Sequence, residues 1–489
     1  MSRTIRLLQW LTMCIIAVST ELIYIDDEHY MYDVGDRLLS IGLESQYVAD
    51  PTRFDFRSTK LLQLAKGLAP AYLRIGGTSC DFLLFNESLS KDVTLPTLPR
   101  SNYTLSEKRF DDINNFAAQS GLRLLFDLNV FLRKGPAWDP TNSQEIFTYA
   151  KNKYPNIDWQ LGNEPDLYRV SLNMDISAEH LAHDFETLSH TRSKSFPSSL
   201  VVGPDTTNPS FLSSSYMASF LKTLHSDNTR IDAVTWHHYY TNGKTAKLAD
   251  FTDPELLDNL QREIDVVEDI VSRYAPNTTV WLGETSSAYG GGAPGISDRY
   301  VAGFMWLDKL GILARHNYKV AIRWSLIVSN YALLDPDLNP NPDYWTSYLY
   351  KTLVGGRVLG VTNISASTSG NESDGKHFRV YAHCTNKRSG YNTGSVVVIA
   401  LNLNNGAATW KAAGYVGSSS VDQYLITSYG SGGLLSKNVA VNGHHVQMLN
   451  DETLPIIKAL NIPRGTLINM PAKTYGFYVF PDIQANACK

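Results

Sequence analysis

Two glutamates lie at the ends of predicted β-strands, where they could perform acid–base chemistry on a sugar. Glu164 ends the stretch IDWQLGNE, and Glu284 ends the stretch TVWLGE. Glycoside hydrolysis uses two carboxyl groups that flank one bond: one protonates the leaving oxygen, and the other attacks the anomeric carbon or activates water. Retaining enzymes hold this pair about 5–5.5 Å apart. One such glutamate alone would equally suit a structural ion pair, but two of them at strand ends favour catalysis.

Residues next to these glutamates fit the same chemistry. Asn163 can hydrogen-bond a sugar 2-hydroxyl while positive charge develops on the ring. Pro165 cannot continue a β-ladder, so the strand stops there and Glu164 faces a cleft. The glycines at 290–292 would let backbone N–H groups approach a sugar carboxylate, and a plain flexible turn is the alternative.

Two adjacent histidines follow the strand-like stretch AVTW. His237 and His238 would point to opposite faces of a strand and lack the spacing of zinc ligands, so we predict no metal site. We expect one of them in the cleft and the other in the wall of the fold. Tyr239 could then orient Glu284 by a hydrogen bond, and a core tyrosine is the alternative.

Eight short hydrophobic runs between about residues 38 and 330 alternate with segments of helical spacing. The runs are RLLSIGLE, AYLRIGG, LRLLFDLN, IDWQLGNE, LVVGPD, AVTWHHY, TVWLGE and KVAIRWSLI. Strands that alternate with helices in this way predict an α/β fold, a (β/α)₈ TIM barrel. Most runs end in polar residues: Glu44, Thr78, Asn129, Glu164, Asp205, His237 with Tyr239, and Glu284. Barrel active sites lie at these ends of the strands, so we expect one site there.

Three of the intervening helices have recognisable start signals. Ser106 can cap one helix, Asp253-Pro254 can open a second, and Ser297-Asp298 can open a third. Each start is followed by apolar residues at helical spacing, which would face the barrel.

The pattern changes after about residue 350, where strand-like runs with turn residues replace helical spacing. These runs are HFRVYAHC, SVVVIALNL, VDQYLITSY, HHVQML and KTYGFYVF, and they predict an appended C-terminal β-sandwich domain. The early stretch ELIYIDD is also strand-like and could complete that sandwich. We therefore predict a signal peptide at 1–20, an N-terminal strand at 21–37 that joins the sandwich, a catalytic barrel at 38–350 and the sandwich at 351–489.

The first twenty residues read as a secretory signal. Arg3 and Arg6 precede a short apolar stretch that is too short to cross a bilayer, and small residues follow it. An uncleaved anchor is the alternative. No other run is long enough to span a membrane, so we predict a secreted, extracellular protein.

The chain carries a formal charge of −5 with scattered Lys and Arg, and it lacks a nucleotide fingerprint. We therefore expect neither a nucleic-acid partner nor a cofactor.

Secretion allows disulfide bonds and N-linked sugars. Cys14 would leave with the signal. Cys384 lies in a strand-like stretch and Cys488 lies beside the C-terminus, so we pair these two and expect Cys80 to be a buried free thiol. Glycosylation signals occur at Asn86, Asn102, Asn277, Asn363 and Asn371.

The segments WQLGNEP, VTWHHYYTNG and VWLGETSSAYGGGAP resemble the heparanase family, glycoside hydrolase family 79, and the resemblance covers nearly the whole chain after the signal. It implies that Glu164 is the acid/base and Glu284 the nucleophile of a retaining endo-β-glucuronidase, with the same disulfide pair. The implied substrate contacts are Thr78, Asn163, His237, Tyr239, Gly290 and Gly291. We also expect contacts from Glu44, which replaces an Asp of the family, Lys244, which replaces an Arg, and Tyr331.

Two departures from the family pattern bear on processing and substrate. Residues 86–100 are far shorter than the linker that vertebrate members excise, so we expect one active, monomeric chain. The family's two basic clusters are also missing: PRSNYTLS contains only Arg100, and GPDTTNPSF contains no Lys or Arg. A sulfated polymer would keep its charge unpaired there. We therefore predict cleavage of hyaluronan, as in the leech-type hyaluronidases of the family. A heparan sulfate endo-β-glucuronidase and an inactive glycan-binding homologue are the alternatives.

Overall fold

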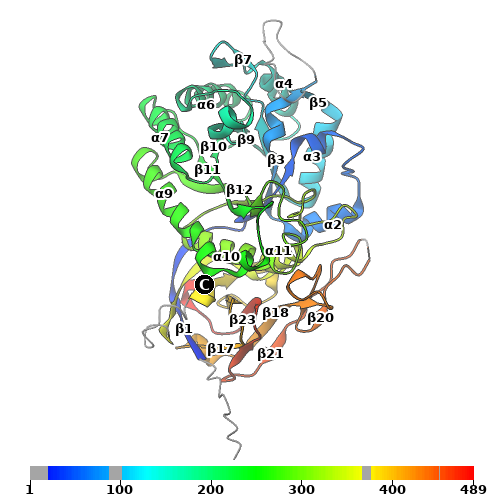
Figure 1. Cartoon of the computed structure of the whole chain (residues 1–489), viewed down its shortest axis with the longest axis vertical. Coiled ribbons are helices and arrows are strands. Elements are labelled where there is room, and N and C mark those ends of the chain that lie inside the picture. Colours follow the sequence, from blue (N-terminus) through cyan, green and yellow to red (C-terminus); the bar gives the residue numbers. More distant parts are fainter. Residues whose placement is uncertain (1–19, 87–101, 366–375, 451) are drawn as a thin grey trace, which may run out of the picture.

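The computed structural model describes residues 20–86, 102–365, 376–450 and 452–489. The predicted signal peptide, most of the segment 86–100 and the glycosylation signal at Asn371 lie outside these ranges. Figure 1 shows a barrel ringed by helices above a large sheet, with α10 and α11 between them. No helix in the described ranges has both the length and the apolar character that a membrane crossing requires.

The barrel consists of eight parallel strands, which confirms the predicted fold. They are β2 (Leu39–Glu44), β3 (Ala71–Gly76), β6 (Leu122–Leu128), β9 (Ile157–Leu161), β10 (Val202–Thr206), β11 (Ala233–Asn242), β12 (Thr279–Tyr289) and β13 (Ala321–Arg323). They pair in the order β10-β11-β12-β13-β2-β3-β6-β9. A parallel bridge between Trp159 and Val201 joins β9 to the residue before β10, so the barrel is nearly closed. All carboxyl ends therefore meet at one mouth.

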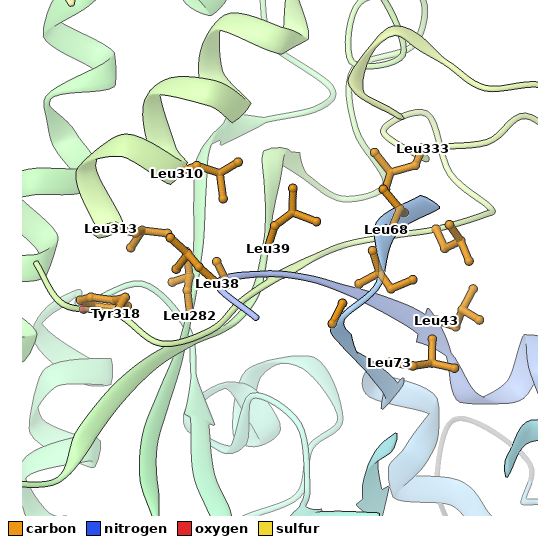
Figure 2. Close-up of a cluster of buried hydrophobic side chains, with 14 of the residues drawn as sticks. Leu38, Leu39, Leu43, Leu68, Leu73, Leu282, Leu310, Leu313, Tyr318 and Leu333 are labelled. Carbon is orange, nitrogen blue, oxygen red and sulfur yellow. The ribbon is translucent and has the colours of Figure 1, made fainter. Parts of the chain in front are cut away.

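Helices surround the barrel wall, and two of them, α10 and α11, lie between the barrel and the second domain. The longer helices are α2 (Thr59–Leu68), α3 (Glu107–Ser120), α4 (Thr141–Ala150), α6 (Ala178–Ser193), α7 (Phe211–Ser226), α9 (Asn259–Tyr274), α10 (Ala302–Arg315) and α11 (Pro342–Leu353). Shorter pieces are α1 (Ser45–Ala49), α5 (Tyr168–Ser171) and α8 (Pro254–Leu257). Figure 2 shows Leu310 and Leu313 of α10 next to Leu38 and Leu282 at the barrel wall. These four leucines are buried, so their packing fixes α10 against the strands.

The structure confirms two of the three predicted helix starts, at Ser106 and at Asp253-Pro254, and corrects the third. Ser106 caps α3 as expected, because its side chain accepts a hydrogen bond from the Arg109 amide. The helix expected from Asp253 is divided into α8 and α9 at Asp258. The helix expected from Ser297 begins later, at Ala302, because the Ser297 hydroxyl accepts the amide of Ala293 at 2.9 Å instead of capping a helix.

The second domain contains an 11-stranded, mainly antiparallel sheet. Its strands are β1 (Thr20–Asp33), β14 (Val354–Asn363), β15 (Phe378–Thr385), β16 (Val396–Asn402), β17 (Ala408–Ala412), β18 (Val421–Tyr429), β19 (Asn438–Val441), β20 (His444–His445), β21 (Leu460–Ile462), β22 (Ile468–Met470) and β23 (Thr474–Phe480). The strand expected over HHVQML is only two residues long. Trp410 of β17 packs edge-on against Tyr478 of β23, so the sheet closes over a second hydrophobic core as a sandwich does.

The N-terminal strand belongs to this C-terminal sheet. β1 runs antiparallel to β14 and parallel to β17, so it joins two parts of the sheet that are distant in sequence. The opposite face of the sheet packs on α10, where glycines permit close approach. A Cβ atom at Gly311 would lie 2.3 Å from the Tyr381 ring. Barrel and sheet consequently share one continuous core.

Two small strand pairs complete the fold near the mouth: β4 (Leu83–Phe85) pairs in parallel with β5 (Tyr103–Leu105), and β7 (Arg133–Lys134) pairs antiparallel with β8 (Ala137–Trp138). Among the predicted glycosylation signals, Asn277 is exposed, whereas Asn86, Asn102 and Asn363 are half-buried. Glycosylation stays a prediction at all of them.

Cys384 and Cys488 form the predicted disulfide bond, and Cys80 is a buried free thiol. The bond links β15 to the C-terminus and closes a long loop, with a sequence separation of 104. We expect Cys488→Ser to lower the free energy of unfolding by about 2–5 kcal/mol, because the unfolded chain loses its cross-link. Thermal unfolding checks this, with dithiothreitol as the control: reductant should lower the Tm of the wild type and leave the Tm of Cys488→Ser unchanged. Equal Tm values for both proteins without reductant would contradict it.

Candidate active site

Glu164 and Glu284 meet across the barrel mouth. Three atoms lie within 4.8 Å of one another: one carboxylate oxygen of each glutamate and one ring nitrogen of His237. The Glu164 side chain is 26% exposed and the Glu284 side chain 9% exposed. The structure thus brings together the two carboxyl groups that the sequence placed at the carboxyl ends of two different strands. Their separation is close to that of a retaining pair.

The backbone at Glu164 turns sharply out of its strand. β9 ends at Leu161 instead of at Glu164, and Gly162 follows with φ +80°. Glu164 itself has φ +53°, a left-handed conformation that costs a non-glycine residue roughly 1 kcal/mol or more. Its amide donates to the Asp205 carbonyl at 3.0 Å, and Pro165 opens a short 3₁₀ helix, η2 (Pro165–Leu167). These contacts hold the strained residue so that its carboxylate lies close to that of Glu284 and to His237 at the barrel mouth.

Glu284 lies inside β12 and is held from two sides. The Tyr239 hydroxyl donates to its Oε1 at 2.6 Å, and Arg74 Nη1 donates to its Oε2 at 2.9 Å. Tyr239 projects from the adjacent strand β11, which pairs with β12 in parallel. Its ring stacks on Tyr331, with centroids 6.2 Å apart. Tyr239 thus contacts Glu284 as expected. Tyr331 packs against the ring of Tyr239 and so helps to hold its position.

Arg74 is the main site residue that the sequence prediction missed. Its guanidinium is fully buried and donates to Glu284, Gln160, Asn163, Asp205 and Asp127. Burial by itself lowers the pKa of Arg74, but the surrounding carboxylates raise it above its usual value, so the group stays charged. An arginine inside the otherwise apolar run AYLRIGG is the signal that could have identified it, because a buried arginine requires anionic partners.

A second buried cation supports Glu164. His237 Nδ1 lies 2.9 Å from Glu164 Oε1, and Nε2 lies 3.4 Å from Asp205 Oδ2. Burial lowers the pKa of His237, but the carboxylates of Asp205 and Glu284 outweigh this and raise it to about 10. The charged imidazole therefore donates from Nδ1 to Glu164 at neutral pH.

Two aspartates complete the charge pattern beneath the glutamates. Burial favours the neutral form of Asp205, but Arg74 and His237 lower its pKa to about 2. Burial raises the pKa of Asp127 to about 7, against the opposing effect of Arg74. The donor types of Glu164, His237 and Glu284 would also suit a cation, but both carboxyl groups already have hydrogen-bond partners in the protein, so the trio fits proton transfer better.

The remaining predicted contact residues lie around this centre. Asn163 Oδ1 accepts from Arg74 Nη2 at 2.8 Å, which leaves its amide N–H₂ group for a ligand. Thr78 is half-buried at the start of the 3₁₀ helix η1 (Thr78–Phe82), next to the end of β3. Glu44 accepts the Ser79 amide at 3.1 Å and the Ser79 hydroxyl, and burial raises the pKa of Glu44.

The glycine loop and Lys244 lie farther out on the rim. Gly290 and Gly291 have φ of +75° and +91°, and no atom lies within 4 Å of a Cβ built on either, so both face open space. Lys244 is exposed in the loop after β11. His238 points away from the mouth into the wall, where its ring packs against Tyr240, which matches the expected alternation of the two histidines.

Comparison with known proteins assigns the chain to a family. Residues 47–311 match the sequence model described as glycosyl hydrolase family 79, N-terminal domain. The chain belongs to glycosyl hydrolase family 79. It is 39% identical to the heparanase of Gallus gallus, which covers 93% of this chain and 94% of that protein. It is 32% identical to the hyaluronoglucuronidase of Hirudo nipponia, over 95% and 98% of the two chains, and 32% identical to the inactive heparanase-2 of Homo sapiens, over 93% and 87%.

Solved structures agree on the architecture. A 4-O-α-L-rhamnosyl-β-D-glucuronidase from Fusarium oxysporum 12S superposes with a TM-score of 0.69 at 18% identity, over 94% of this chain and all of that one. A GH51 arabinofuranosidase from Xanthomonas axonopodis pv. citri gives a TM-score of 0.66 at 13% identity, over 94% and 99%. These matches show the fold alone. The protein is a heparanase-type member of family 79, and it is more similar to the chicken heparanase than to the leech enzyme.

Proposed function

We propose that the protein is a secreted, single-chain, retaining endo-β-glucuronidase that cleaves the GlcA-β-1,3-GlcNAc bonds of hyaluronan. The observation that supports it most is the approach of Glu164 and Glu284 within 4.8 Å at the barrel mouth. At this separation one carboxyl group reaches the anomeric carbon while the other reaches the leaving oxygen. No cofactor takes part in this chemistry.

The surroundings of the two glutamates assign their roles. Glu284 is buried, and its two carboxylate oxygens accept hydrogen bonds from Tyr239 and Arg74, so this side chain is held in place as a nucleophile. It attacks the anomeric carbon and forms a glycosyl ester, while Glu164 gives its proton to the leaving oxygen. The protonated His237 stabilises the Glu164 carboxylate that remains. Glu164, which is more exposed, then takes a proton from water, and the resulting hydroxide attacks the same carbon and releases Glu284.

The choice of hyaluronan rests on charge. The stretch GPDTTNPSF forms β10, the following loop and the first residue of α7 at the mouth, and it offers no cation to a sulfate. Binding a densely sulfated chain against such a surface would leave anionic groups desolvated without partners. Hyaluronan contains one carboxylate per disaccharide and no sulfate. The second candidate, an inactive glycan-binding homologue, is disfavoured because both carboxylates and their donors are in place.

Product analysis tests the proposal. We expect the protein to shorten hyaluronan and leave heparan sulfate intact, with glucuronic acid at every new reducing end in mass spectra. Proton NMR of the first products should show the β-anomer of that sugar, because two successive displacements retain configuration.

Other outcomes would contradict separate parts of the proposal. Shortened heparan sulfate beside intact hyaluronan would overturn the substrate. N-acetylglucosamine at the new reducing ends would overturn the linkage, and an initial α-anomer would overturn the retaining mechanism.

A further inference from the structure

Large exposed apolar side chains of the barrel gather at its mouth. Within the described part of the barrel, all of them except Val266 lie in segments at or after the carboxyl ends of strands. They are Leu167, Val170, Phe211, Leu212, Tyr289 and Val328. Phe211 is 86% exposed, Val170 79% and Leu212 67%. Single exposed apolar residues are ordinary, but a group at a cleft marks a contact surface.

Four of these side chains form what we call the apolar rim: Leu167, Val170, Phe211 and Leu212. Leu167 ends η2, Val170 lies in α5, and the other two begin α7. The two segments are joined, because Asp166 accepts the Thr207 amide at 3.1 Å and its hydroxyl at 2.5 Å. The two segments that carry the apolar rim are therefore held together by the folded protein.

The apolar rim has no visible role in folding. α7 packs on the barrel through Met217, Phe220, Leu221 and Leu224, which are buried, whereas Phe211 and Leu212 point into solvent. Covering a Phe or Leu side chain is worth about 1.5–3 kcal/mol, so leaving a group of them exposed is costly unless a ligand covers them.

The position of the apolar rim indicates which part of a ligand it meets. Leu167 and Val170 follow Glu164 within six residues, and the Glu164 amide is tied to Asp205 just before the loop that leads to Phe211. A general acid must lie beside the oxygen that it protonates, so the sugar that leaves with this oxygen lies on the Glu164 side of the cleft.

We propose that the apolar rim is the subsite for the leaving sugar and that it selects an N-acetylated, unsulfated hexosamine. This inference rests on the proposed function. The side chains of Phe211 and Leu212 cover the acetyl methyl group and the C–H face of the ring, which are the apolar parts of such a sugar. A sulfate in the same place would lose its hydration against apolar atoms. Arg169, exposed between Leu167 and Val170, adds a single positive charge, which suits one carboxylate per disaccharide.

Kinetics of rim variants test this subsite. We expect Phe211→Ala/Leu212→Ala to lower kcat/KM on hyaluronan about tenfold, since two apolar contacts are lost. Replacing both residues by lysine should lower it further and increase retention of the protein on a heparan sulfate column. The control is Val266→Ala, which shortens an exposed apolar residue on the outer helix α9 and should leave kcat/KM unchanged. All of these positions are exposed, and unchanged Tm values check that the variants are folded.

The outcomes separate the inference from the function on which it rests. Wild-type kcat/KM for the double alanine variant, with hyaluronan cleaved normally, overturns the subsite and leaves the proposed function standing. A loss of the same size in Val266→Ala also overturns it, because the effect would then not belong to the rim. No cleavage of hyaluronan by the wild type overturns both.

Discussion

The Glu284→Gln variant is expected to cleave hyaluronan roughly 10⁴-fold more slowly than the wild type or worse, as when other enzymes lose their covalent nucleophile. The amide of glutamine is a poor nucleophile, so no glycosyl ester forms. The release of new reducing ends measures the effect. The fold should survive, because Arg74 keeps its contacts with Asp205 and Asp127 and the side chain keeps its shape.

A matched control separates this loss from a general effect of removing a carboxylate. Glu268→Gln changes a half-exposed glutamate that contacts His316 on the outside of the barrel, and it should retain full activity. The assignment of Glu284 would be wrong if its glutamine variant cleaved at the wild-type rate. It would also be wrong if the loss of activity followed a loss of folding, as judged by circular dichroism and Tm.

Arg74→Met should be the most destabilising single change in the barrel mouth. The substitution leaves Asp127, Asp205 and Glu284 buried without the guanidinium that links them. Breaking a buried ion pair from one side costs about 3–5 kcal/mol, because the remaining charges are uncompensated. Urea unfolding measures the change. Activity should also fall by at least about 10²-fold, since a donor that fixes the charged nucleophile is lost.

Two further variants define what Arg74 contributes. Arg74→Lys keeps the positive charge but loses the planar guanidinium group with its several donors. Compared with Arg74→Met, it should therefore recover part of the lost stability and a smaller part of the lost activity. Arg273→Met removes an exposed ion pair with Asp269 on α9 and should change neither. A stable and active Arg74→Met variant would show that the cluster does not depend on its central cation.

The sequence predicted the barrel well because the relevant signals are local. Each strand contains a short apolar run, and a polar residue such as Glu44 or Glu284 follows that run, so the pattern of strands and the gathering of polar groups could both be predicted. The disulfide was also predictable, since Cys384 and Cys488 were the partners left on strand-like and terminal segments. These predictions needed no knowledge of distant contacts.

The errors arose where a residue's role depends on which partners the folded chain brings to its side chain. Arg74 is central only because Asp127, Asp205 and Glu284 converge on it from three other strands. Ser297 has the composition of a helix cap, but Ala293 and Ser287 engage its hydroxyl first. In both cases hydrogen bonds of the folded chain determine the outcome, and the only local signal was the arginine inside the apolar run AYLRIGG.

The place of β1 in the sheet sets an order for events during synthesis of the chain. β1 leaves the ribosome before the barrel strands, yet its neighbours β14 and β17 lie beyond residue 353, after the whole barrel. The nascent barrel can therefore be complete while β1 still lacks both partners. Once they arrive, β1 is the only link in the order β14-β1-β17-β22 that joins the last two strands to the rest of the described sheet. A chain that begins after Asp33 would thus release β17 and β22 and uncover Trp410, which would expose the domain to aggregation while its barrel remained whole.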